Sequence, residues 1–201
     1  MGSPGGSLLD IGVGAAGLSV AMARLWPSLT VVVIDPWEPS LALARENVQS
    51  AGLTDRIELR EQAAEDVSDT DAFDLAWIPS AFIPETVIFA ACETVYRALR
   101  PGGWLLFAMA SPGTDPVTAS LVRLRTVFWG GCLMTYDQIE TLLKECGFTD
   151  VRTLPAAKPN QSAGQAESRE RRSPSAAGDD LGGHGGVEDG NHHRSGSVLH
   201  L

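Results

Sequence analysis

The sequence predicts an α/β fold of the Rossmann-like type, a three-layer sandwich with a mostly parallel sheet between layers of helices. Apolar runs alternate with helical patterns from residue 7 to residue 154, which is typical of a parallel sheet whose strands are joined by helices. A glycine-rich turn follows the first apolar run, and the second run ends in an acid, Asp35. These two features indicate a nucleotide-binding βαβ unit.

The first βαβ unit is expected to end at Asp35. Its first strand is expected at 7–11, and its helix at 15–25, because Pro27 prevents the helix from continuing. The run at 29–35 is apolar without alternation, which indicates a strand buried on both faces.

The same alternation continues along the chain. Strands are expected at 57–60, 73–78, 104–110 and 148–154, and helices at 39–51, 84–99, 116–128 and 135–146. Gly52 and Gly147 can each end a helix in a left-handed conformation, and Pro101 prevents continuation of the helix before it. Thr135 and Gln138 have the spacing of a capping box, which marks a helix start.

Composition divides the chain into three segments. Residues 1–6 are expected to be a flexible leader and residues 7–154 a single folded domain. Residues 155–201 are rich in glycine, serine, proline and charge. Such a segment cannot bury enough apolar surface to offset its ordering entropy, so we expect a disordered tail.

Charge, hydropathy and cysteine content limit which partners and which cellular compartment are expected. The formal net charge is −10, so the chain would repel a phosphate backbone, and nucleic acid is not expected as a partner. No apolar run reaches the roughly 18 to 20 residues of a membrane span, and no membrane partner is expected. The odd number of widely spaced cysteines favours reduced thiols in the cytoplasm.

Residues around the glycine turn indicate the type of cofactor. Gly12 and Gly14 allow a tight turn and a close approach of backbone to ligand. Asp35 could accept hydrogen bonds from both hydroxyls of a ribose. Asp10 would repel a pyrophosphate over this turn but would stabilise an ammonium and a sulfonium, which favours S-adenosylmethionine over a dinucleotide.

Residues 7–154 resemble a class I S-adenosylmethionine-dependent methyltransferase of the small-molecule type. Four stretches carry the resemblance, namely residues 9–17, 33–35, 44–47 with 52–59, and 99–104. The family's sheet usually ends in an antiparallel hairpin, for which 197–201 is a weak candidate strand. The hairpin is therefore expected to be incomplete, and the family's usual cap ahead of the first strand is not expected.

The resemblance implies a set of cofactor-binding residues. These are Asp10, Gly12 and Gly14 at the methionine end, Asp35 at the ribose, Trp37 on an adenine face, Ala64 near the adenine amino group, and Ile78 beside the transferred methyl. The family usually has an acid at the position of Ala63, and Gln62 or Glu65 would have to replace it.

The catalytic residue stays unassigned, and no metal site is expected. Residues 78–80 lack the Asn/Asp-Pro-Pro-Tyr/Phe motif of enzymes that methylate nitrogens of nucleic acid or protein, and the acid of metal-assisted enzymes. No histidine precedes His184 to serve as a base. The acceptor pocket could be lined by aromatic side chains, with helix core as the alternative, at Phe82, Phe128, Trp129 and Tyr136.

The resemblance implies methyl transfer to a small-molecule acceptor, with oxygen favoured as the target atom. An NAD(P)-dependent oxidoreductase is the alternative enzyme, because Gly12, Gly14, Gly17 and Asp35 also fit the dinucleotide fingerprint. A cofactor-binding fragment without catalytic activity is a third interpretation. Assembly as a homodimer is left open.

Overall fold

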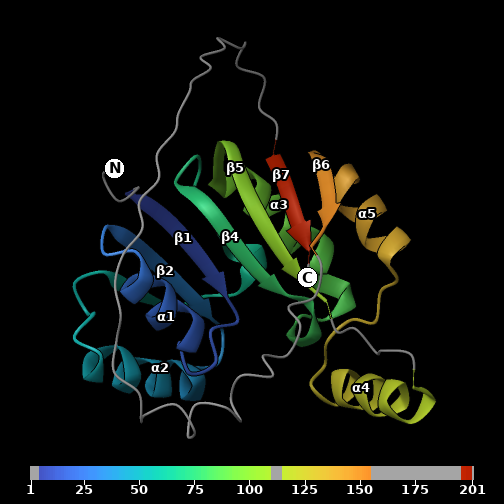
Figure 1. The fold of residues 1–201 in the computed structure, drawn as a ribbon, viewed down its shortest axis with the longest axis horizontal. Coiled ribbons are helices and arrows are strands. Elements are labelled where there is room, and N and C mark those ends of the chain that lie inside the picture. The colour runs from blue at the N-terminus through green and yellow to red at the C-terminus, as the bar shows by residue number, and fades with distance from the viewer. Residues whose placement is uncertain (1–4, 110–114, 155–195, 201) are drawn as a thin grey trace, which may run out of the picture. The chain divides into compact units, whose positions relative to one another are not determined.

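A parallel β-sheet forms the centre of the fold (Figure 1). The computed structural model describes residues 5–109, 115–154 and 196–200. Within these residues the sheet has seven strands in the order β3-β2-β1-β4-β5-β7-β6. The strands are β1 (Gly6–Ile11), β2 (Leu29–Asp35), β3 (Ile57–Glu61), β4 (Phe73–Pro79), β5 (Leu99–Ala108), β6 (Phe148–Thr153) and β7 (Gly196–His200).

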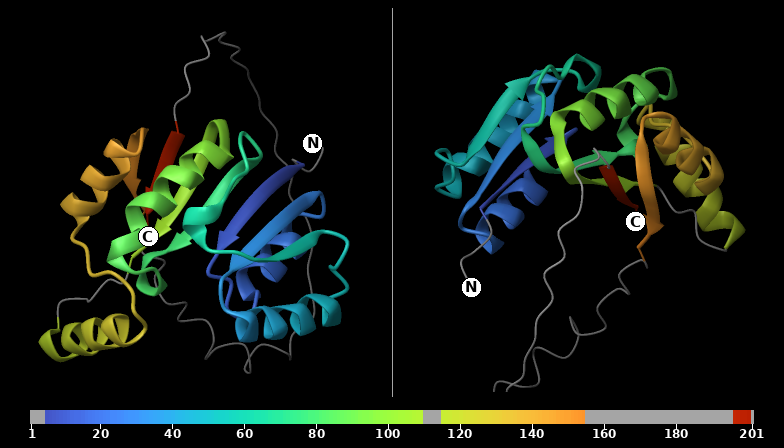
Figure 2. Two further views of the ribbon diagram at one scale, coloured as in Figure 1. Left: turned by 180° about the vertical axis from the view of Figure 1, so that it is seen from behind. Right: turned by 90° about the horizontal axis from the view of Figure 1, so that it is seen from above.

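Helices cover both faces of the sheet, and each face has its own apolar core. The helices α1 (Gly17–Leu25) and α2 (Glu38–Ser50) pack with Leu8 and Val31 on one face. On the opposite face, α3 (Glu85–Ala98) and α5 (Tyr136–Glu145) pack with Leu9 (Figure 2). Adjacent residues of β1 thus point to opposite cores, as strand geometry requires. The Rossmann-like α/β fold expected from the sequence is confirmed.

Local signals in the sequence account for several element boundaries. Thr135 and Gln138 form the predicted capping box at the start of α5. Asp115 caps α4 (Pro116–Phe128) by accepting a hydrogen bond from the amide of Thr118. The strand predicted at 104–110 instead begins at Leu99, because the turn at Pro101 is included in the paired region.

The C-terminal part of the sheet differs from the expectation. Strand β7 lies between β5 and β6 and runs parallel to both. Residues 196–200 are therefore a strand, whereas the expected tail included them, and the pairing seen is not an antiparallel hairpin. The remainder of that expected tail, 155–195, lies outside the described residues, as do residues 1–4 of the expected leader.

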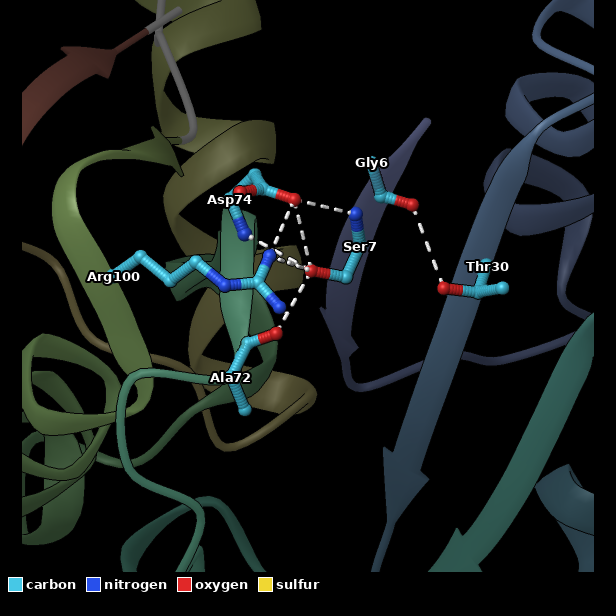
Figure 3. A network of polar contacts seen from close by, with 6 residues as sticks. All are labelled: Gly6, Ser7, Thr30, Ala72, Asp74 and Arg100. Atoms are coloured by element: carbon cyan, nitrogen blue, oxygen red, sulfur yellow. Dashed lines mark hydrogen bonds and ion pairs between the residues drawn. The ribbon is translucent and has the colours of Figure 1, made fainter. Parts of the chain in front are cut away.

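A polar network ties the amino-terminal ends of the central strands together (Figure 3). The Asp74 carboxylate accepts a hydrogen bond from the Ser7 amide at 2.8 Å and pairs with the Arg100 guanidinium at 2.7 Å. Burial acts to raise the pKa of Asp74, but hydrogen bonds from Arg100 and Ser7 outweigh it and the pKa is lowered. This network lies at the opposite end of the strands from the glycine turn, so we assign it a structural role.

Candidate functional site

A cavity of about 830 Å³ lies at the carboxyl-terminal ends of β1 and β2. This edge of an open parallel sheet is where α/β proteins bind ligands. The cavity is lined by Ile11–Gly14, Ile34–Trp37, Ser40, Gln62–Glu65, Phe82–Pro84, Val87 and Trp129. It therefore joins the first βαβ unit to the start of α3 and to the residue that follows α4.

The glycine turn forms the floor of the cavity. Gly12 and Gly14 have φ angles of 68° and 51°, in the left-handed region that favours glycine. The Gly12 amide donates to the carbonyl of Ile34 at 2.9 Å, which holds the turn against β2. A Cβ at Gly14 would meet no atom within 4 Å, so the backbone angle, rather than crowding by the protein, explains the glycine.

Asp10 is buried immediately beneath this turn. Its side chain is 3% exposed, and the Ser19 hydroxyl on α1 donates a hydrogen bond to its carboxylate. Burial raises the pKa of Asp10 from 3.8 to about 6, and the hydrogen bond from Ser19 opposes part of that rise. A cation placed nearby would compensate the buried carboxylate, because opposite charges favour its ionised form.

Asp35 presents a carboxylate at the end of β2. One oxygen, Oδ1, accepts the amide of Trp37 at 2.9 Å. Among the described residues no other donor bonds this carboxylate, so Oδ2 can accept hydrogen bonds from a ligand in the cavity. The Trp37 side chain is exposed on the wall beside it.

The wall formed by residues 62–65 carries one carboxylate. Gln62 uses its side-chain nitrogen to donate to the carbonyl of Asp66 at 2.7 Å. Glu65 lines the cavity and makes no side-chain hydrogen bond or ion pair with another described residue. Of the two candidate replacements for an acid at Ala63, the Gln62 side chain is thus held by the protein, whereas Glu65 offers a charged acceptor for an amino group.

The structure brings most of the residues predicted from the sequence together. Gly12, Gly14, Asp35, Trp37 and Ala64 all line the cavity. Two predicted residues do not line it, since Asp10 lies beneath the turn and the Ile78 side chain is fully buried in the core. The Ile78 side chain is therefore not on the cavity wall, where the sequence analysis expected it. The ligand contacts of all seven residues stay predictions.

The far end of the cavity is apolar and aromatic. It is formed by Phe82, Ile83, Pro84, Val87 and Trp129. The Phe82 and Trp129 rings stack with centroids 4.8 Å apart, and the Arg125 guanidinium lies 4.8 Å from the Trp129 ring centre. Sequence reasoning identified the two rings as pocket candidates but missed the contribution of α3, which carries no motif.

Phe128 lies neither in the acceptor pocket nor in the helix core, the two places that the sequence analysis offered for it. Its side chain is 85% exposed, and it does not line this cavity. The expectation that it lies in the helix core is therefore wrong, because α4 packs on the protein through Thr126 and points Phe128 toward solvent.

A close backbone contact holds the aromatic end in place. The Cys132 amide donates to the carbonyl of Ser80 at 3.2 Å, and the Ser80 hydroxyl donates to the carbonyl of Ala108. A Cβ on Gly131 would lie 1.9 Å from the carbonyl oxygen of Ala81. Only glycine fits there without displacing backbone, so this contact positions both Trp129 and Phe82.

No metal chemistry is indicated by the residues that the structure describes. They contain no group of three or more histidine, cysteine, aspartate or glutamate side chains that could hold a metal ion. The aromatic end of the cavity also carries no acidic or basic side chain among its lining residues.

Comparison with protein families matches residues 8–103 to a methyltransferase domain. Two curated relatives are similar to parts of this chain. A release factor glutamine methyltransferase from Gloeobacter violaceus is 30% identical over 157 residues, covering 65% of this chain and 54% of the relative. The ubiquinone/menaquinone biosynthesis C-methyltransferase UbiE of Hydrogenovibrio crunogenus is 30% identical over 118 residues, covering 58% and 46%.

A solved structure that contains S-adenosyl-L-methionine is similar to this chain in fold. The phosphoethanolamine N-methyltransferase 2 of Haemonchus contortus, in complex with S-adenosyl-L-methionine, aligns with a TM-score of 0.59 and 25% identity. The alignment covers 74% of this chain and 34% of that protein. The chain thus spans about half the length of the curated relatives it matches.

Proposed function

We propose that this chain, whose residues 8–103 match a methyltransferase domain, is a class I S-adenosylmethionine-dependent methyltransferase that transfers the methyl group to an oxygen atom of a small-molecule acceptor. The observation that supports this most directly is the cavity itself. One end offers the glycine turn and the Asp35 carboxylate, and the other end is apolar and aromatic. The first suits a nucleoside cofactor, and the second suits an apolar acceptor.

The residues present fit S-adenosylmethionine. Gly12 and Gly14 leave the floor open to backbone contact, and Asp35 Oδ2 is available to the ribose hydroxyls. The buried Asp10 carboxylate supplies the negative charge that the ammonium and sulfonium groups need. A pyrophosphate would face the same charge unfavourably, which is why we set the NAD(P)-dependent oxidoreductase aside.

The reactivity comes from the cofactor, which carries its methyl group on an electrophilic sulfonium. The residues of this chain bind the cofactor, orient the acceptor and exclude water from the cavity. Phe82 and Trp129 form the wall against which an acceptor would lie. Among the described residues that line this end of the cavity, no side chain can remove a proton, so the acceptor that we propose has an oxygen already ionised at neutral pH. Carboxylic acids and acidic phenols meet this condition, whereas aliphatic alcohols and protonated amines do not.

The relatives leave the target atom open, since their names include methylation of glutamine and of carbon. The lack of a base among the described residues at the aromatic end favours oxygen, because an ionised oxygen needs no proton removal in the transition state. The three cysteines, all buried and unpaired, fit a reducing compartment. We therefore place the reaction in the cytoplasm.

Methyl transfer from labelled S-adenosylmethionine to a panel of acceptors tests the proposal. The panel pairs each apolar carboxylic acid and acidic phenol with the corresponding alcohol and amine. Transfer to the first group and none to the second is expected. Transfer only to amines or alcohols would contradict the oxygen assignment, and binding of cofactor without any transfer would favour the non-catalytic interpretation.

A further inference from the structure

Helix α4 presents its apolar side chains away from the protein. Five of them are exposed, and four form one stripe, at 68% for Val117, 60% for Leu121, 66% for Leu124 and 85% for Phe128. At about 100° per residue, these four positions fall within an arc of about 60°. Thr126, the residue that α4 buries, lies on the opposite side of the helix. Helices normally pack on their apolar stripe, so the orientation of α4 requires an explanation.

The position of α4 links this apolar stripe to the cavity. Figures 1 and 2 show α4 set apart from the helices that cover the sheet, on the side toward which the strands point. The next residue, Trp129, lines the cavity and stacks on Phe82. Whatever covers the apolar stripe therefore lies beside the aromatic end of the cavity.

The charge of this region differs from that of the chain. The chain has a formal net charge of −10, yet α4 itself carries two arginines and no acid, and the nearest acids along the chain are Asp115, whose carboxylate caps the start of α4, and Asp137. Arg123 and Arg125 are both exposed, and Arg125 also lies over the Trp129 ring. The region is thus an apolar and basic surface on an acidic protein, which would orient the chain with α4 toward a negatively charged partner.

A second copy of the chain does not fit this surface well. The 13 residues of α4 form a helix about 20 Å long. A stable interface buries about 800 Å² and some 20 to 30 residues on each side, far more than four side chains of one helix supply. The net charge of the chain also opposes the close approach of two copies.

We propose that α4 docks on an anionic lipid bilayer. Short helices that bind in the plane of a membrane combine an apolar face with basic residues, and Phe, Trp and Leu are common on that face. Val117, Leu121, Leu124 and Phe128 enter the boundary between headgroups and acyl chains, and Arg123 and Arg125 meet lipid phosphates. The acidic remainder of the chain is screened beyond a Debye length of about 8 Å.

The docking is peripheral. No described helix is long and apolar enough to cross a membrane, and the surface proposed here departs from the expectation of no membrane partner. Docking brings Trp129 and the aromatic end of the cavity to the lipid surface, from which an apolar acceptor enters. It does not depend on methyl transfer, so its test is separate from that of the proposed function.

Vesicle flotation of the full, cofactor-free chain tests the proposal. Vesicles of phosphatidylcholine with phosphatidylglycerol are compared with vesicles of phosphatidylcholine alone. The wild-type chain is expected to float with the anionic vesicles and more weakly with the neutral ones. Leu124→Ser combined with Phe128→Ser is expected to weaken binding to both at least about tenfold, because it removes inserted apolar area. Arg123→Gln is expected to weaken binding about fivefold on anionic vesicles only.

Leu25→Ser is the matched control, because Leu25 on α1 is exposed to the same extent as Leu124 but lies on another element. It is expected to float as the wild type does. Absence of flotation by the wild-type chain, or an equal loss in Leu25→Ser, would overturn the proposal. So would light scattering that shows a wild-type dimer and a monomeric Leu124→Ser variant, since the stripe would then be occupied by a second copy. Circular dichroism of each variant confirms that the fold is retained.

Discussion

The two ends of the cavity are built in different ways. At the β1–β2 end, two strands, a glycine turn and a helix pack tightly, and the charged group is a buried carboxylate, Asp10. At the aromatic end, Phe82 and Trp129 belong to short connecting segments held by a backbone contact at Gly131. The first end is constrained by the packing of the domain, whereas the second depends on a few local contacts. We therefore expect the first to determine cofactor binding and the second to determine the acceptor.

Two tryptophans provide the sharpest test of this division. Trp129→Ala is expected to lower the rate of methyl transfer about 100-fold, because misplacing an acceptor is costly, while affinity for S-adenosylhomocysteine changes less than about twofold. Trp37→Ala should instead lower that affinity about 5-fold to 100-fold, the range for stacking of a base on an aromatic ring. Calorimetry and initial rates measure both effects. If the two variants lowered the affinity for S-adenosylhomocysteine equally, the assignment of one end of the cavity to the cofactor and the other to the acceptor would be wrong.

Asp10 makes the first end sensitive to pH. Its pKa in the folded chain, about 6, lies above the ordinary value of 3.8. Between pH 3.8 and about 6 the folded state therefore holds a proton on Asp10 that the unfolded state has lost. The stability that this protonated carboxyl contributes is lost as pH rises through about 6. At pH 7 the buried charge lowers the free energy of unfolding by up to about 3 kcal/mol. Asp10→Asn should be more stable than the wild type at pH 7 and equally stable near pH 3, as measured by urea unfolding at several pH values.

The protonation of Asp10 should also affect cofactor affinity. Raising the pH through about 6 lowers the stability of the fold but should strengthen cofactor binding. The ionised carboxylate favours a bound ammonium, so affinity for S-adenosylhomocysteine should fall as pH drops below about 6 in the wild type. In Asp10→Asn the affinity should be weaker and nearly independent of pH over the same range. A wild-type affinity that does not change between pH 5 and 7 would indicate that Asp10 has no part in binding.

Gly131 tests the local contact at the aromatic end. Gly131→Ala must displace the carbonyl of Ala81, which would lie 1.9 Å from the new Cβ. We expect a loss of about 1 to 3 kcal/mol in the free energy of unfolding, typical of overpacking, together with slower transfer. Gly17→Ala is the control, since its Cβ would meet no atom within 4 Å and its φ is not positive. That variant should be neutral or slightly stabilised.

Ala16 offers the smallest effect. It is fully buried with φ of 59°, a left-handed conformation that disfavours residues with a Cβ by roughly 1 to 2 kcal/mol. Glycine relieves this strain but loses more entropy on folding. Ala16→Gly should therefore stabilise the chain by less than about 1 kcal/mol, visible as a small increase in the urea midpoint. A clear loss of stability would show that the methyl group of Ala16 packs more favourably than its backbone conformation costs.

The same contrast explains what the sequence could predict. Gly12, Gly14 and Asp35 were identifiable because a tight turn and a strand end demand particular residue types at fixed spacing. The buried face of α2 followed from apolar periodicity, whereas that of α1 did not, because α1 buries Ser19 and Ala23 and leaves Leu25 exposed. Val87 and Pro84 could not be assigned to the cavity, because lining it requires no special residue type, only the way that α3 packs.

Two errors came from long-range packing. Phe128 fits a helical apolar stripe, and periodicity cannot show whether a stripe faces the protein or points away from it. Residues 197–201 were expected only as a weak candidate strand of an antiparallel hairpin. The parallel pairing of β7 between β5 and β6 could not be predicted, because these five residues lie far along the chain from both partners. Both outcomes depend on tertiary contacts that a local pattern does not contain.

Calorimetric titration with S-adenosylhomocysteine and with NADH is the most direct test of the cofactor assignment. The wild-type chain should bind S-adenosylhomocysteine and show no measurable NADH binding, because Asp10 lies under the turn. Asp35→Ala should lose about 1.5 to 3 kcal/mol of that affinity, the range for hydrogen bonds to a charged group. Tight NADH binding without S-adenosylhomocysteine binding, or an Asp35→Ala variant with unchanged affinity, would contradict the account.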